Sequence, residues 1–375
     1  MPTFLFILGI LLFICLILIH EFGHFIIARR NGVEVEEFGL GFPPRIWAKK
    51  MRSGFKFSIN YIPLGGFVKL KGEYDSDQAK GGYGVSSIGT KVKIMLAGVV
   101  MNVLAAYVIL TVLAFVGLPQ LINNQFTVKS NTRVIKSSVL AGSVESKSPA
   151  SSIGLKSEDQ LISISSHGKT YRITDANKLP SITKSFAGQQ VTVVYEESSN
   201  IRSASVQLRT SAVVDKSQNS KNPIGYLGID PVNLTLSRST WSAPIVAAGL
   251  LKQITVLTFK GLGNAIAGLF QGNTTKASSQ VSGPVGIVEI LKNSTVLGYQ
   301  FVLVIVALIS LSLAIFNVLP LPPLDGGKLF YSLVARIFTR HAVKKSTEDA
   351  LNAIGVVFIL ILFVLITIVD IHRIF

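Results

Sequence analysis

The chain has 375 residues, of which 49% are hydrophobic and only 15% charged, and it carries a net charge of +16. So few charged residues, together with a mean hydropathy of +0.51, favour a membrane protein over a soluble globular one. The basic residues form no aromatic-interleaved patch and no zinc-finger spacing. We therefore attribute them to loops beside membrane spans and expect no nucleic-acid partner.

Four apolar stretches are each about as long as the ~20 residues that a helix needs to cross a bilayer. We predict transmembrane helices at residues 1–27, 93–118, 293–330 and 350–370. The stretches "ARRNG", "KVK" and "RIFTRHAVKK" put basic residues on one side of these spans, which the positive-inside rule makes cytoplasmic. Both termini then lie outside, and the lipid bilayer is itself a partner of the chain.

The first span ends in "HEFGH". His20 and His24 are four residues apart, so on a helix they point the same way and can hold one metal ion. Glu21 is placed to take a proton from a metal-bound water, and zinc suits two imidazoles and a carboxylate. Ionisable groups inside a spanning segment are costly and mark function, so this cluster predicts a hydrolytic zinc site.

Residues 28–92 form the predicted cytoplasmic loop. Apolar and polar residues alternate in "FKFSINY", "IPLGG" follows as a turn, and "FVKLK" returns, which predicts a membrane-associated β-hairpin. We hypothesise that Phe57 and Ile59 lie at its free edge and bind an extended substrate as an added strand. The Gly/Pro-rich stretch 39–47 is expected to be irregular.

The long outer segment contains two parts. Residues 125–212 show short alternating strands such as "QLISI" and "VTVVYE" and a helical stretch beginning near Asp175, which predicts an α+β domain. Residues 213–292 are predicted to be a linker with amphipathic helices. Within it, residues 241–270 are apolar enough to span, but Lys252 and Lys260 near one helical face favour an interfacial or domain-packing helix.

The third span contains "NVLPLPPLDGG". Its prolines forbid a regular helix, and irregular backbone at membrane depth is tolerated only in a protein interior or a wet cavity. Asp325 is the best candidate for the third metal ligand. Asn317 is placed to offer its amide to a substrate backbone or to a developing oxyanion.

These motifs together resemble the site-two protease family of intramembrane zinc metalloproteases, and most closely its bacterial branch with a PDZ domain, typified by the regulator of sigma-E protease. "YIPLGGFVKLKGE" and "AGVVMN" carry the same resemblance. It implies His20, His24 and Asp325 as zinc ligands, Glu21 as general base and Asn317 as a substrate contact. It also implies that the outer α+β domain is PDZ-like and acts as a steric gate.

We therefore expect an α-helical multi-pass membrane protein with about four transmembrane helices, a cytoplasmic β-hairpin and an extracytoplasmic PDZ-like domain. The expected activity is a Zn²⁺-dependent endopeptidase of the bacterial cytoplasmic membrane. Its implied substrates are single-pass transmembrane proteins, such as anti-sigma factors or remnant signal peptides, already cut by another protease. The alternatives are a non-catalytic PDZ-bearing receptor with a structural metal, and a metal or proton transporter. Glu21 disfavours the receptor, and the lack of internal symmetry in the sequence disfavours the transporter.

Overall fold

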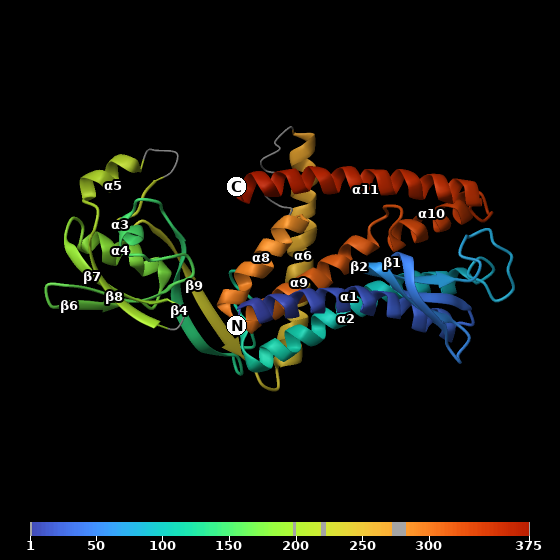
Figure 1. Ribbon diagram of the computed structural model, residues 1–375, viewed down its shortest axis with the longest axis horizontal. Helices are drawn as coiled ribbons and strands as arrows, with labels where there is room; N and C mark the ends of the chain where they lie inside the picture. Colours follow the sequence, from blue (N-terminus) through green and yellow to red (C-terminus); the bar gives the residue numbers. More distant parts are fainter. Residues whose placement is uncertain (1, 198–199, 219–222, 272–282, 375) are drawn as a thin grey trace. The chain divides into compact units, whose positions relative to one another are not determined.

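The computed structural model describes residues 2–374 apart from 198–199, 219–222 and 272–282. The chain divides into two units, one formed by Met1–Leu113 with Pro244–Phe375 and the other by Ala114–Ala243. The elements of the first unit, labelled in Figure 1, are α1 (Pro2–Arg30), β1 (Val35–Lys50), β2 (Lys56–Leu70), α2 (Ile88–Val116), α6 (Ala243–Phe270), α8 (Pro284–Leu297), α9 (Tyr299–Val318), α10 (Asp325–Phe338) and α11 (Lys345–Ile374).

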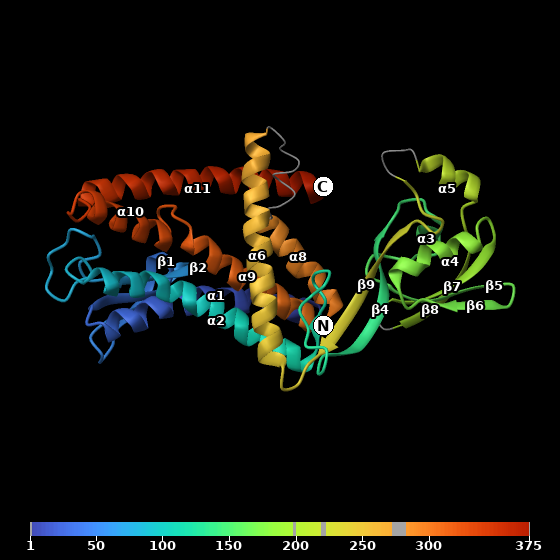
Figure 2. The ribbon, with the colours of Figure 1, turned by 180° about the vertical axis from the view of Figure 1, so that it is seen from behind.

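Five of the described helices are long and apolar enough to cross a membrane, namely α1, α2, α6, α9 and α11. Four of them overlap the spans predicted from sequence, and the fifth, α6, is the segment for which an interfacial or packing role was expected. In Figures 1 and 2, α6 runs across the direction of α1 and α11. By length and composition alone, five of the described helices are candidate spans. Of these, α6 does not run in the direction of α1 and α11.

The third predicted span is not one continuous helix. The helix α9 ends at Val318 and α10 begins at Asp325, with the proline-rich residues 319–324 between them. Proline lacks an N–H donor and its ring clashes with the preceding helical turn, which explains an interruption at this place. Asp325 consequently lies in the first turn of a new helix.

The small sheet formed by β1 and β2 differs from the predicted hairpin. "IPLGG" is part of β2 rather than a turn between two strands, and the irregular stretch expected at 39–47 is part of β1. Both strands fold back on themselves, so residues 37–40 of β1 pair with 56–59 of β2 on one side and with 66–69 on the other. Gly41 and Gly65 have positive φ values of 76° and 108°, which glycine adopts without the strain of a side chain.

Aromatic side chains attach this sheet to α1, and Figures 1 and 2 both draw it beside that helix. The ring of Phe25 in α1 contacts those of Phe38 and Phe55, with centroids 5.7 and 4.8 Å apart. Arg29 in the last turn of α1 lies over Phe25 and donates a hydrogen bond to the main-chain carbonyl of Ser53 at 3.3 Å. The sheet is thereby held along the half of α1 that carries the HEFGH motif.

A buried charged cluster anchors α10. Asp75, only 1% exposed, forms a short ion pair with Lys91 of α2, lies 3.5 Å from Arg336 of α10 and accepts a hydrogen bond from the Val343 amide. Its own amide donates to Glu348 of α11 at 2.8 Å. Burial alone would raise the pKa of Asp75, but the hydrogen bonds from Lys91 and Val343 and the charges of Lys91 and Arg336 hold it below its usual value.

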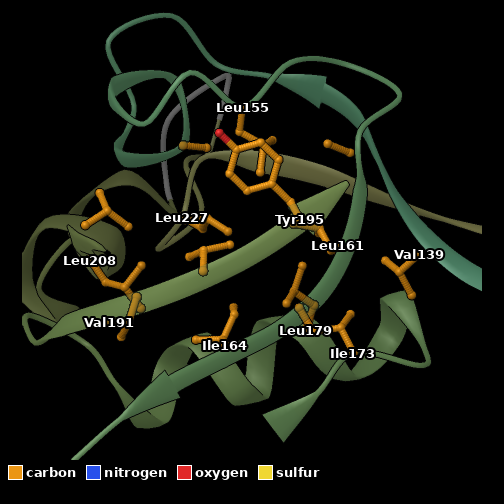
Figure 3. Close-up of a cluster of buried hydrophobic side chains, with 14 of the residues drawn as sticks. Val139, Leu155, Leu161, Ile164, Ile173, Leu179, Val191, Tyr195, Leu208 and Leu227 are labelled. Carbon is orange, nitrogen blue, oxygen red and sulfur yellow. The ribbon is translucent and has the colours of Figure 1, made fainter. Parts of the chain in front are cut away.

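The second unit is an α+β domain with an antiparallel sheet of seven strands. Its elements are β3 (Leu118–Pro119), β4 (Arg133–Val144), α3 (Pro149–Ser152), β5 (Gln160–Ser166), β6 (Lys169–Arg172), η1 (Ala176–Lys178), α4 (Leu179–Ser185), β7 (Gln190–Glu197), β8 (Asn200–Gln207), α5 (Ser211–Ser217) and β9 (Ile229–Arg238). The strand order is β3-β9-β4-β5-β7-β8, with β6 on β5. Figure 3 shows the core, in which Leu161, Ile164 and Val191 from the strands lie among buried side chains that include Leu179 of α4.

This domain is larger than the predicted range 125–212. The strands "QLISI" and "VTVVYE" are β5 and β7, and Asp175 caps the expected helical stretch by accepting a hydrogen bond from the Asn177 amide. The predicted linker, however, contributes β9, which pairs with β4 along its length and with β3. The sequence of β9 alternates poorly because it begins "IDPVN", and its partner strand lies about 90 residues earlier in the chain.

We expect the substitution Asp75→Asn to lower the free energy of unfolding by about 3–5 kcal/mol at pH 7, because Lys91 is left as a buried charge without its partner. A lowered pKa means that the Asp75 carboxylate stabilises the fold above about pH 4 and that this contribution is lost as the pH falls through the folded-state value. Thermal unfolding in detergent should show the difference between the two proteins shrinking below about pH 4.

Glu36→Gln is the matched control for the charged cluster. Glu36 pairs with Lys69 at 3.0 Å, but both side chains are about half exposed. Its loss should cost less than about 1 kcal/mol. Equal effects of the two substitutions at pH 7 would contradict a stabilising role for the buried cluster.

Candidate metal centre

Helix α1 brings the three ionisable residues of HEFGH to one place. The side chains of His20 and His24 are buried, and their Nε2 atoms are 3.2 Å apart. Residues four apart on a helix share one face, so this geometry follows from the spacing. The two imidazoles therefore direct one nitrogen each at a common point.

Asp325 completes this group from the first turn of α10. Its Oδ2 lies 3.1 Å from Nε2 of His20 and 3.2 Å from Nε2 of His24. The two glycines that follow make this position reachable, because a Cβ on Gly326 would lie 2.3 Å from the Val318 carbonyl oxygen and one on Gly327 would lie 2.4 Å from the main chain of residues 321–322. Small residues thus let α10 begin directly against the proline-rich break.

The three groups fit a zinc ion by their geometry and chemistry. Tetrahedral ligands at 2.0–2.2 Å from zinc lie about 3.3–3.6 Å from one another, close to the 3.1–3.2 Å found here. Asp325 Oδ2 is buried with no hydrogen-bond partner among the described residues, so an atom with lone pairs faces the centre of the triangle. Within the described part of the chain, these three residues are also the one group of this kind close enough to share an ion.

Helix α2 packs against the rings of both histidines. Nδ1 of His24 donates to the main-chain carbonyl of Ile94 at 2.7 Å, which leaves Nε2 with its lone pair free for a metal. A Cβ on Gly98 would lie 2.5 Å from both His20 Cε1 and His24 Nε2. Our sequence reasoning missed the roles of Ile94 and Gly98, although Gly98 stands in the quoted "AGVVMN" stretch.

A cavity of about 420 Å³ opens beside His20 of this group. Glu21 and Asn317 both line it, together with His20, so the predicted base and the predicted substrate contact face the same space. The rest of the lining is mainly apolar, from Phe13, Ile14, Ile17, Phe42, Gly65, Gly66, Asn102 and Leu313. A carboxylate and a carboxamide next to a metal site in an apolar cavity are suited to hydrolysis of an apolar segment.

The predicted strand-binding residues lie elsewhere in the sheet than expected. Phe57 pairs with Phe38 and Lys49, and Ile59 pairs with Leu40 and Trp47, so both lie in the interior of the sheet and offer no free main chain.

The segment Gly66–Leu70 pairs with β1 on one side only and forms an edge of the sheet. Its Val68 amide is directed at the Glu21 carboxylate, and a Cβ on Gly66 would lie 3.3 Å from Glu21 Cγ. The free edge nearest to the metal ligands is therefore the second half of β2.

The second unit has a cavity of its own, of about 150 Å³. Leu179 and Thr183 of α4 line one part of it, and the segment Tyr226–Ile229 lines another. Gly228 has φ +78°, and no acceptor within the described residues bonds the amides of Leu227 and Gly228. The segment has the sequence "GYLGI" and lies in the range predicted to be a linker.

Comparisons with known proteins identify the family of the chain. A family model described as "Peptidase family M50" matches residues 8–362. A Clostridium perfringens protein named "Putative zinc metalloprotease" is 28% identical over 97% of this chain and 98% of its own length. A Helicobacter pylori protein with the same name is 30% identical over 95% of each chain, and the "Probable protease eep" of Enterococcus faecalis is 23% identical over 100% of this chain and 99% of its own.

We expect Gly98→Ala to weaken zinc binding by at least about 100-fold, because the added methyl group displaces both imidazoles, whereas loss of a supporting contact alone costs 10–100-fold. The measurement is a competition titration with a chromophoric chelator on detergent-purified protein.

Gly89→Ala is the matched control, since it adds the same methyl group to α2 where the nearest atom is 4.0 Å away. It should bind zinc as the unmodified protein does. Unchanged zinc affinity in Gly98→Ala would show that the helices do not hold the histidines as described.

Proposed function

The chain belongs to peptidase family M50, the site-two protease family, and on this premise we propose that it is an intramembrane zinc endopeptidase that cuts the spanning segment of a single-pass membrane protein. The observation that carries the proposal is the convergence of His20, His24 and Asp325 beside a cavity that Glu21 also lines. A structural metal site needs ligands but no general base beside an open space, so this arrangement favours hydrolysis over a receptor.

The mechanism assigns one task to each polar side chain of the cavity. His20, His24 and Asp325 hold the zinc, which when bound supplies an acidified water and a Lewis acid for the scissile carbonyl. Glu21 takes the proton from the attacking water and passes it to the leaving nitrogen. Asn317, on the last turn of α9, donates its amide hydrogen to the substrate carbonyl and so holds the reacting strand.

The substrate enters as an extended strand in this proposal. A peptide bond inside an intact helix is shielded, and the segment has to unwind before it can react. The edge Gly66–Leu70 supports this route, because it is unpaired on the side that carries the Val68 amide and lies beside Glu21. An added strand here would satisfy its main chain by hydrogen bonds to the edge of the sheet.

The bacterial cytoplasmic membrane is the location that the family resemblance implies, and the charges that flank the spans support the proposed orientation in it. We place α1, α2, α9 and α11 across the bilayer, with the β1/β2 sheet and the basic loops on the cytoplasmic side. We assign α6 to the outer membrane surface, because Lys252 and Lys260 interrupt it and because it runs across α1 and α11 in Figure 1. This leaves four spans and keeps Asp325 on the same face as His20.

The second unit is proposed to be a PDZ-like domain that limits which substrates enter. The cavity between α4 and Tyr226–Ile229, with two unbonded amides at its rim, supports recognition of an extended peptide there. Substrates would be remnants that an earlier protease has freed of their outer domains, such as cut anti-sigma factors or signal peptides. This substrate class rests on the family resemblance.

We expect Glu21→Gln to lower cleavage of a tagged single-pass helix by about 10²–10⁴-fold while zinc stays bound, because the general base is lost but the ligands are intact. The measurement is cleavage in detergent across a panel of such helices, with zinc content determined on the same samples.

His20→Ala is the comparison for Glu21→Gln, and it should lose both zinc and cleavage. A chelator should abolish cleavage by the unmodified protein. Cleavage that persists in Glu21→Gln would refute the proposed base, and zinc retained at full affinity in His20→Ala would refute the proposed ligands.

We expect Val68→Pro to reduce cleavage by at least about tenfold with zinc retained. Proline removes an amide that points away from β1 and spares the ladder within the sheet. The Glu21 carboxylate accepts from this amide in the structure, and in the proposal the added strand takes over the bond. Val68→Ala keeps that amide and should cleave normally. Normal cleavage by Val68→Pro would speak against strand addition at this edge.

A further inference from the structure

Helix α2 carries a polar side chain that the proposed mechanism leaves without a task. Asn102 is completely buried, and its Oδ1 has no hydrogen-bond partner among the described residues. A buried carboxamide oxygen without a donor is unfavourable, so its presence among the otherwise apolar residues 94–106 of α2 requires an explanation. Asn102 is four residues after Gly98 and therefore on the same face of α2.

That face of α2 meets the two histidines. The Ile94 carbonyl accepts the Nδ1 hydrogen of His24 at 2.7 Å, Gly98 leaves room for both rings, and Asn102 has its Nδ2 3.4 Å from Nδ1 of His20. The polar neighbour of each Nδ1 is thus supplied by the same helix, two turns apart.

The chemistry of a metal-bound imidazole decides which atom of Asn102 is needed. A neutral histidine that gives the lone pair of Nε2 to a metal carries its hydrogen on Nδ1, and that hydrogen requires an acceptor. His20 is 8% exposed, so solvent does not readily supply one. A half-turn of the Asn102 side chain exchanges its nitrogen and oxygen without changing its shape and presents the unpartnered oxygen to Nδ1.

We propose that Asn102 is a positioning residue whose side-chain oxygen accepts the Nδ1 hydrogen of His20 and thereby directs Nε2 of His20 at the metal. Ser310 of α9 bonds only to the main chain of this turn, where its hydroxyl donates to the Asn102 carbonyl at 2.8 Å, and it takes no part in the proposed side-chain contact. The inference rests on the proposed zinc ligands and not on the proposed proteolysis. It assigns to His20 the kind of support that the Ile94 carbonyl gives to His24.

The experiment measures zinc affinity by competition titration and the absorption spectrum of the cobalt-substituted protein. We expect Asn102→Leu, which keeps the volume and removes the acceptor, to weaken zinc binding by about 10–100-fold and to alter the cobalt spectrum. Asn102→Asp restores an acceptor of the same shape and should bind zinc within about threefold of the unmodified protein, with its cobalt spectrum preserved.

Ser310→Ala separates the side-chain contact from helix packing. It removes the bond to the main chain of Asn102 and leaves the carboxamide in place, so zinc affinity should stay within about threefold. The proposal is overturned if Asn102→Leu binds zinc normally, if Asn102→Asp is as weak as Asn102→Leu, or if Ser310→Ala is equally weak.

His20→Ala in the same titration separates the positioning role of Asn102 from the proposed set of zinc ligands. If His20→Ala loses zinc affinity and Asn102→Leu keeps it, only the positioning role fails. If neither substitution changes zinc affinity, the proposed ligand set fails as well. Normal zinc affinity in Asn102→Leu with loss of cleavage would assign Asn102 to the substrate instead.

Discussion

The close approach of α1 and α2 is the constraint on which the metal centre depends. Two glycines permit it: a Cβ on Gly23 would lie 2.6 Å from the Ala97 carbonyl oxygen, and one on Gly98 would enter the histidine rings. Small residues are the usual means by which helices pack closely in membranes, where no hydrophobic effect drives them together. Here the short distance also brings the polar atoms of α2 within reach of His20 and His24. The close packing of these two helices and the proposed metal binding therefore depend on the same glycines.

The third proposed ligand depends on a different kind of support. Asp325 stands at the start of α10, and that helix is fixed at its other end through Arg336, which meets the buried Asp75. Lys91 ties the same cluster to the start of α2. The candidate site thus lies between the helix pair α1 and α2, which packs closely at glycines, and α10, which is held by an ion pair.

Much of the candidate site could be predicted from the amino-acid sequence. The parts that the sequence did not predict were missed for physical reasons. His20, Glu21, His24 and Asp325 were identifiable because charged groups are rare in apolar segments and stand out there. Ile94 acts through a carbonyl that every residue has, so no sequence pattern marks it. The strands β1 and β2 were misjudged because each folds back on itself at glycines, and β9 was missed because its partners are distant in the chain. Local periodicity does not report such pairings.

The separation of the ligands along the chain has a consequence for biosynthesis. His20 and His24 lie in the first helix, whereas Asp325 comes about 300 residues later. A nascent chain that has inserted α1, α2 and the second unit has the proposed base and two imidazoles but lacks the third ligand. Full zinc affinity should therefore be acquired only when α10 docks, late in synthesis. The membrane would not be exposed to an active peptidase before the fold that encloses the cavity is complete.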